Sequence, residues 1–203
     1  MKKLAAAVFT VALLAGAAMS ASAYEYTIGG NVGFDYMSND PLSGDSSSFF
    51  TIVPEFAKII DEDTNVGIGL SYGHGDLMIF ARQLGINVPL GISIPIGKVT
   101  TIGGYLFAER AVLSAGSFKV FLRGDIGYTY VDIDDVDEHP YWISVGISPN
   151  IQYGLTDRLT LIVSSDVLRL GFDYMKVGDE NITTFGFNAG KGAITSVGLK
   201  YAF

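Results

Sequence analysis

The chain has 203 residues, 49% of them hydrophobic and 12% aromatic, and its formal net charge is −8. The acidic balance argues against nucleic acid as a partner. The lack of cysteine excludes disulfides, thiolate metal sites and a lipidated N-terminal cysteine. After the first 23 residues no run of 18 uninterrupted apolar residues occurs, so we expect no transmembrane helix.

The N-terminus has the three parts of a secretory signal peptide. Lys2 and Lys3 are positive, Leu4–Ala18 is apolar, and small residues before Tyr24 form a cleavage site. The apolar part is short for a membrane-spanning helix. We therefore predict a cleaved signal peptide over 1–23 and one barrel domain over 24–203.

Regular alternation marks the first predicted strand, Tyr24–Tyr36, in which apolar residues share one face and polar residues the other. A polar loop with Pro and Gly follows over 38–48. The same alternation predicts strands over 49–60 and 66–73, separated by the tight polar turn Asp61–Asn65.

The segment His74–Thr100 is too long for a turn and too apolar for an ordinary exposed loop. Pro89 and Pro95 argue against central strands, because proline cannot donate to a strand ladder. We expect a long structured loop. The alternative is two further strands, which would make ten if 77–100 joins the wall.

Four more strands are predicted before the last, and their connections alternate in length. The strands are 101–113, 118–130, 141–153 and 159–174, the last with a slip in alternation at Asp166 that suggests a bulge. Short turns are expected at 114–117 and 156–158, and longer polar loops at 132–140 and 175–192.

The last strand carries the most specific pattern in the chain. Four apolar or aromatic residues occupy alternate positions on one face and end on an aromatic: Val197, Leu199, Tyr201 and Phe203. The opposite face carries small residues and Lys200. A strand with one apolar face and with small and charged residues on the other suits the wall of a membrane barrel.

These elements predict an all-β fold, an eight-stranded antiparallel transmembrane β-barrel. Short turns at one end and long loops at the other are typical of bacterial outer-membrane barrels. The alternative is a secreted or periplasmic lipocalin-like barrel whose apolar faces point inward around a ligand. The terminal aromatic pattern and the tyrosines near predicted strand ends favour the membrane barrel.

Together, the signal peptide, the alternating strands, the uneven connections and the terminal Phe203 resemble the small OmpA/OmpX-type bacterial outer-membrane β-barrel proteins. The resemblance implies location in the outer membrane of a Gram-negative cell. It also implies contact with outer-membrane lipid and lipopolysaccharide, and assembly by the barrel-assembly machinery. It does not identify an extracellular ligand for the loops.

Charged residues on the predicted inner faces form the first candidate site. They are Glu25, Asp35, Glu55, Lys119, Arg123, Asp125 and Lys200. An eight-stranded barrel is just narrow enough for side chains to fill it. We therefore expect a lumen closed by a charge network and a structural or loop-display role. The alternative is a narrow porin-like channel for ions or small solutes.

The remaining polar clusters predict no catalytic, metal or cofactor site. The acidic residues Asp132, Asp134, Asp135, Asp137 and Glu138 lack the spacing of an EF-hand. His74 and His139 flank predicted loops, but nothing orders a Ser-His-acid set around them. We expect no enzyme, and a lipid-modifying barrel enzyme is the weakest of the three hypotheses.

Overall fold

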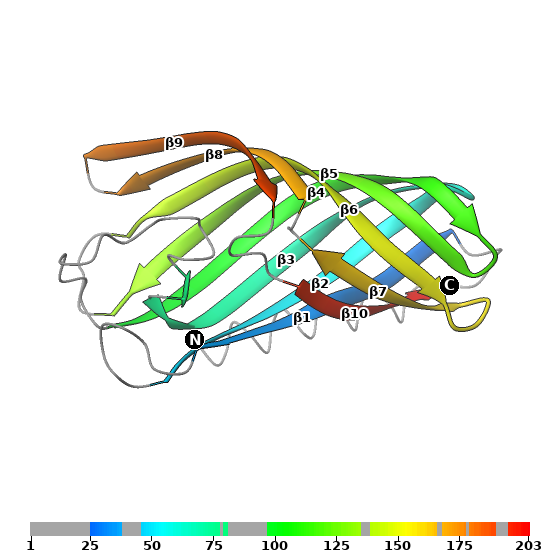
Figure 1. The fold of residues 1–203 in the computed structure, drawn as a ribbon, viewed down its shortest axis with the longest axis horizontal. Helices are drawn as coiled ribbons and strands as arrows, with labels where there is room; N and C mark the ends of the chain where they lie inside the picture. Colours follow the sequence, from blue (N-terminus) through cyan, green and yellow to red (C-terminus); the bar gives the residue numbers. More distant parts are fainter. Residues whose placement is uncertain are drawn as a thin grey trace.

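The computed structural model describes residues 25–37, 46–77, 79–80, 97–134, 139–165, 168–177, 179–189 and 195–203. These residues form an antiparallel β-barrel (Figure 1). The predicted signal peptide lies outside them and stays a prediction. The same holds for Asp135, Asp137 and Glu138 of the acidic loop and for Asp166.

Ten strand segments build the barrel. The first six are β1 (Tyr26–Met37), β2 (Ser47–Asp61), β3 (Thr64–Asp76), β4 (Lys98–Ala115), β5 (Phe118–Ile133) and β6 (Tyr141–Gly154). The other four are β7 (Leu159–Ser165), β8 (Leu168–Val177), β9 (Glu180–Ala189) and β10 (Thr195–Ala202).

The barrel closes through the last strand. Each of β1 to β5 pairs with the next strand along the chain, β6 pairs with β7, β7 with β10, and β10 with β1. In the described part of the chain this circuit has eight strands, all antiparallel, which confirms the predicted fold class. We call the end that holds the β2–β3, β4–β5 and β6–β7 turns the short-turn end, and the opposite one the loop end.

The predictions for the seventh strand and the loop after it were wrong. Instead of one strand over 159–174, β7 pairs with Asn150–Gly154 of β6 and β8 pairs with Tyr141–Ile147. The segment 175–192, predicted as a polar loop, holds the end of β8 and the whole of β9. Polar residues such as Asn181, Thr183 and Thr184 hide the hydrophobic alternation there, although threonine itself favours strands.

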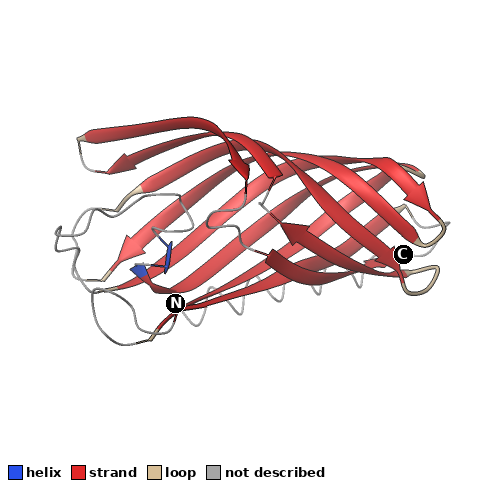
Figure 2. Ribbon diagram, in the orientation of Figure 1, coloured by secondary structure: helices blue, strands red, loops and turns tan. Residues whose placement is uncertain are grey.

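The segment predicted as a long loop starts and ends in strand. β3 continues to Asp76 and β4 begins at Lys98, while Leu77, Ile79 and Phe80 form a short helical turn (Figure 2). Residues 81–96 lie outside the described part of the chain. No described residue of 77–97 forms a wall strand, and the barrel has eight wall positions rather than ten.

The outer face of the barrel is apolar, and the buried polar and charged side chains lie on the inner face, as the alternation predicts. Val197, Leu199 and Tyr201 of the terminal pattern are all exposed on the outside. Aromatic rings gather near both ends: Tyr26, Phe56 and Phe203 at the short-turn end, and Tyr128, Tyr141 and Tyr174 nearer the loop end. This orientation is opposite to that of a lipocalin-like barrel.

No helix among the described residues is both long and apolar enough to cross a membrane.

Candidate functional site

The lower lumen centres on the carboxylate of Glu109 on β4. Its Oε1 accepts hydrogen bonds from Lys200 Nζ at 2.6 Å, Asn65 Nδ2 at 2.9 Å and Gln152 Nε2 at 3.1 Å. The Glu109 and Lys200 side chains are 0% and 6% exposed. The pair therefore ties β4 to β10 across the barrel, with β3 and β6 contributing the two amides.

A second buried ion pair joins β2 to β5. Arg123 Nη2 lies 2.7 Å from Glu55 Oε1, and Tyr105 Oη donates to the same oxygen at 2.6 Å. The Arg123 guanidinium also lies 3.8 Å from the centroid of the Phe107 ring, in a cation–π arrangement. We call Glu55, Tyr105, Glu109, Arg123 and Lys200 the charged cluster.

The charged cluster is balanced, with two carboxylates facing two cations. Removing a charge from water costs roughly several kcal/mol per ion, and an ion pair with good geometry offsets this cost. Because every charge of the cluster has a partner within 2.7 Å, the cluster can stay buried and fill the lumen. The arrangement suits a plug better than a reactive centre.

Gly69 on β3 makes room for this packing. The ring of Tyr105 lies against the Gly69 backbone, and a Cβ added at Gly69 would overlap the ring atom Cζ and the hydroxyl oxygen Oη. The two residues are direct partners across the β3–β4 ladder. The glycine thus lets the tyrosine lie flat and reach Glu55.

An apolar cluster fills part of the lumen at the loop end. We call it the upper apolar cluster, and its buried members are Phe49, Ile79, Phe80, Val99 and Val131. The rings of Phe49 and Phe80 stack with centroids 5.6 Å apart. The helical turn after β3 therefore folds inward, so that the lumen is occupied at two heights.

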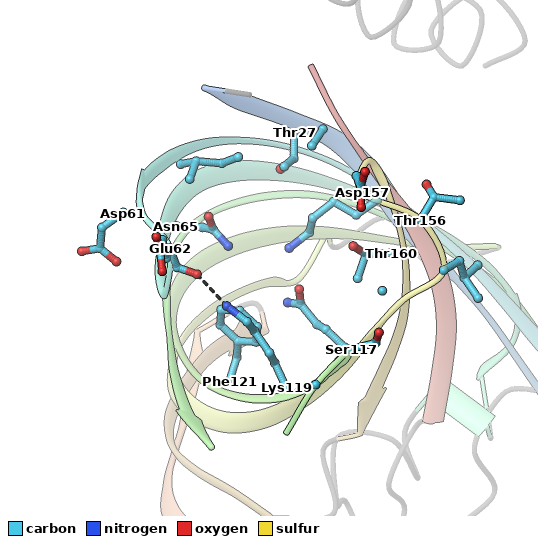
Figure 3. Close-up of a pocket in the computed structure, with 17 residues that line it drawn as sticks. Thr27, Asp61, Glu62, Asn65, Ser117, Lys119, Phe121, Thr156, Asp157 and Thr160 are labelled. Carbon is cyan, nitrogen blue, oxygen red and sulfur yellow. Dashed lines mark hydrogen bonds between the residues drawn. The ribbon is translucent and has the colours of Figure 1, made fainter. Parts of the chain in front are cut away.

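A cavity of about 490 Å³ opens at the short-turn end, below the charged cluster (Figure 3). Asn65, Thr27 and Thr160 point into the ring of strands, whereas Asp61 points away from it. Lys119 closes one side, because its Nζ lies 2.8 Å from the Glu62 carbonyl and 3.1 Å from Asp63 Oδ1. Lys200 and Gln152 line the cavity and bind Glu109 behind it.

A third polar group lies higher in the wall, on β6 and β8. Arg169 Nη1 is 3.0 Å from Asp173 Oδ2, and Trp142 Nε1 donates to Asp173 Oδ1 at 3.1 Å. The guanidinium lies over Gly146 and Gly171, where an added Cβ would overlap it. These side chains are half-buried, unlike the buried Glu109 and Lys200.

The structure brings together only some of the predicted lumen charges. Glu55, Arg123 and Lys200 belong to the charged cluster, and Lys119 lies at the short-turn mouth. Asp35 and Asp125 are half-buried on inner faces, and each has an interaction partner. Glu25 precedes β1 and is exposed, which places it apart from the cluster.

Residue-by-residue reasoning missed the central carboxylate. Glu109 and Arg110 are adjacent, so one of them had to face outward, and the sequence alone did not say which. In the structure Glu109 is buried inside and Arg110 is exposed outside. The signal that decides between them is register: Glu109 is the ladder partner of Arg123 and Asn65, both on inner faces.

The two histidines lie at the loop end on the outer face. His74 Nδ1 is 3.0 Å from Thr100 Oγ1, and His139 Nδ1 is 3.3 Å from Asp132 Oδ1. Thr100 is only 6% exposed, so its hydroxyl is poorly placed for attack on a bulky substrate. Within the residues that the structure describes, no three His, Asp or Glu side chains gather as a metal site.

Comparison with known proteins gives distant structural likenesses. No family model matches the chain, and no curated protein matches it. Neisserial surface protein A (NspA) is 16% identical with a TM-score of 0.44, covering 88% of this chain and 96% of that one. A major outer membrane protein from Thermus thermophilus is 13% identical with a TM-score of 0.39, covering 88% and 99%. The Yersinia pestis outer membrane protein Ail is 11% identical with a TM-score of 0.35, covering 89% and 100%.

Proposed function

We propose that the protein is an integral outer-membrane barrel with a closed lumen, whose role is structural and which presents its loops outside the cell. The observation that carries this proposal is the pairing of an apolar outer surface with a lumen filled by the charged cluster. A membrane barrel needs an apolar outer surface, and a lumen filled by side chains suits a barrel that does not conduct.

The outer surface supports placement in a bilayer. Closure of the eight-strand circuit pairs the backbone of neighbouring strands, which lipid requires. Aromatic rings near both ends of the wall suit two membrane–water interfaces, since each ring is apolar and the tyrosine hydroxyl prefers water. On this proposal the short-turn end faces the periplasm, and lipid, lipopolysaccharide and the assembly machinery are the partners.

A narrow channel is the second candidate, and a specific observation favours it. The short-turn cavity leads up to the charged cluster. Several buried polar atoms in the described part of the chain have no protein partner, among them Asn31 Oδ1 and both side-chain polar atoms of Asn150. Buried polar atoms of this kind suit internal water. A file of water past the cluster is the path that conduction would need.

Epitope insertion tests the placement and the topology. A tag inserted between Met37 and Ser46 is expected to bind antibody on intact cells. The matched tag, placed in the β4–β5 turn between Gly116 and Ser117, should bind only after the outer membrane is permeabilised. Equal labelling of both tags on intact cells, or recovery of the folded protein in the soluble periplasmic fraction, would contradict the proposal.

A further inference from the structure

The short-turn cavity is large enough to hold a small molecule. Its volume of about 490 Å³ lies within the range of small-molecule sites, roughly 300–1,000 Å³. Figure 3 shows Thr27, Asn65 and Thr160 pointing into the ring of strands that surrounds it. Lys200 lines its inner end and binds Glu109 of the charged cluster behind it. The cavity therefore opens at the short-turn end and has polar side chains at its base.

Four buried polar residues line the cavity from four different strands. Thr27 lies on β1, Asn65 on β3, Gln152 on β6 and Lys200 on β10, and all four are between 5% and 9% exposed. Side chains on wall strands hold a more precise geometry than side chains on loops. The cavity is therefore a preformed polar site.

These side chains have hydrogen-bonding capacity that the described part of the chain does not use. The Lys200 ammonium has three donors, and the one described acceptor is Glu109 Oε1. Asn65 and Gln152 donate to the same carboxylate oxygen through their amide nitrogens, which leaves their amide oxygens as acceptors. The Thr27 hydroxyl has no described partner. Because buried polar groups are normally hydrogen-bonded, these atoms need water or a ligand in the cavity.

The unused groups combine donors, acceptors and an apolar wall. Thr160 is the ladder partner of Lys200, so its hydroxyl lies on the strand next to the ammonium. Phe121 supplies an apolar surface on another side of the cavity. A ligand hydroxyl both donates and accepts, so several hydroxyls on an apolar carbon frame match this lining.

The charges around the cavity favour an uncharged ligand. Glu62 and Asp157 are exposed at the mouth and oppose the entry of an anion. The ammonium of Lys119 lies there too, but it is paired with Asp63 Oδ1 at 3.1 Å. A cation would meet the buried ammonium of Lys200 at the base, where a like charge is costly.

We propose that the short-turn cavity binds a small uncharged polyhydroxylated ligand, such as a short saccharide. Its hydroxyls accept from Lys200 and donate to the amide oxygens of Asn65 and Gln152, and the hydroxyls of Thr27 and Thr160 complete the set. This binding goes beyond the structural role. The barrel alone defines the site, and the proposed membrane placement decides only that the ligand comes from the periplasm.

Three sugars that differ in charge test the proposal. The probes are glucose, glucuronate with a carboxylate in place of one hydroxymethyl group, and glucosamine with an ammonium in place of one hydroxyl. Binding to the refolded full-length protein is measured by saturation-transfer NMR, at a pH where both analogues are charged. The micelles are of a phosphocholine detergent, because a detergent with a sugar headgroup would compete for the site.

Glucose is expected to give a saturable signal, and both charged analogues should bind at least about threefold more weakly. Thr27→Val and Thr160→Val should each weaken glucose binding by about threefold to tenfold, the worth of one neutral hydrogen bond. Thr184→Val is the matched control, because Thr184 lies on β9 and does not line the cavity. Valine keeps the β-branched shape of threonine, and the heat-modifiable gel shift verifies that each variant is folded.

Three results would overturn the proposal. Absence of a saturable glucose signal in folded protein would show that the cavity holds only water. Glucose affinity unchanged in both Thr27→Val and Thr160→Val would place the binding elsewhere on the molecule. Equal affinity for glucose and a charged analogue would show that the ligand class is wrong. None of these results bears on the membrane placement, which the epitope tags test separately.

Discussion

Buried ion pairs in the lumen couple strands that are distant in the sequence, and Glu109 is the clearest case. Glu109→Gln removes the charge that Lys200 faces at 2.6 Å and leaves a buried ammonium without a counter-charge. Breaking a buried pair in this way costs about 3–5 kcal/mol. We expect a loss of this size in the free energy of unfolding, measured by urea titration of the refolded barrel with Trp142 emission as the signal.

Two matched variants separate charge burial from general perturbation. Asp63→Asn removes the carboxylate that faces Lys119 at the mouth, where the Asp63 side chain is 51% exposed. It should cost less than about 1 kcal/mol, because exposed pairs are weak. The double variant Glu109→Leu with Lys200→Met should recover much of the loss. A Glu109→Gln protein as stable as Asp63→Asn would show that Glu109 is not the centre of the plug.

Gly69 is the second residue whose identity the packing requires. Gly69→Ala pushes a methyl group into the Tyr105 ring and separates the Tyr105 hydroxyl from Glu55. Overpacking of this kind costs about 1–3 kcal/mol. The control is Gly186→Ala, where the space is open. Equal unfolding midpoints for the two alanine variants would contradict this packing.

At the residue scale, the alternation predicted that Glu55, Arg123 and Lys200 face the lumen, and all three side chains are buried there. It could not predict which of these residues meet. Contacts such as Lys200 with Glu109 join residues 91 positions apart, and only the register of intervening strands brings them together. Register depends on every turn in between. Alternation in the sequence therefore predicts which side chains face the lumen, but it does not predict which of them contact each other.

At the element scale, closure depends on the contact between the last strand and the first two. Phe203 lies 6.5 Å from both the Tyr26 and the Phe56 rings, measured between centroids. Its backbone also exchanges hydrogen bonds with Tyr26, at 2.9 and 3.2 Å. The terminal aromatic therefore packs on β1 and β2 at the point where the circuit closes.

Phe203→Ala removes two ring contacts, each worth about 0.5–1.5 kcal/mol beyond burial, and keeps the backbone bonds. We expect the folded band of the heat-modifiable gel shift to convert to the unfolded band at a lower temperature. Phe185→Ala is the matched control, because that ring is the most exposed of the large hydrophobic side chains that the structure describes. If Phe185→Ala lowers the conversion temperature as much as Phe203→Ala does, closure does not depend on the terminal ring.

The strands that could be predicted are those whose alternation is clear and whose neighbours follow in chain order. β1 to β6 and β10 show period-2 alternation, and their positions were correct to within a few residues. The prediction failed at β8 and β9. β8 alternates like the others, with Leu168, Leu170 and Phe172 exposed, but its departure from β7 to pair with the upper part of β6 has no signal in the sequence. In β9, polar residues hide the hydrophobic alternation on which prediction depends.

At the scale of the whole molecule, eight strands close into a barrel whose lumen holds the charged cluster and, nearer the loop end, the upper apolar cluster. The charged cluster ties distant strands together and blocks the axis. Composition and strand alternation predict the barrel, but they carry no information on which side chains meet in its lumen, because that depends on the register of every strand pair.

The closed lumen is the central claim, and planar-bilayer recording of the refolded protein tests it most directly. Folding is verified by the heat-modifiable gel shift. Insertion is verified with the variant Ile143→Trp in a Trp142→Phe background, whose emission lipids with brominated acyl chains should quench. The account predicts a folded, inserted barrel that is electrically silent. Discrete current steps from the wild-type protein that change in size in Arg123→Ala would contradict it and would establish a conducting lumen.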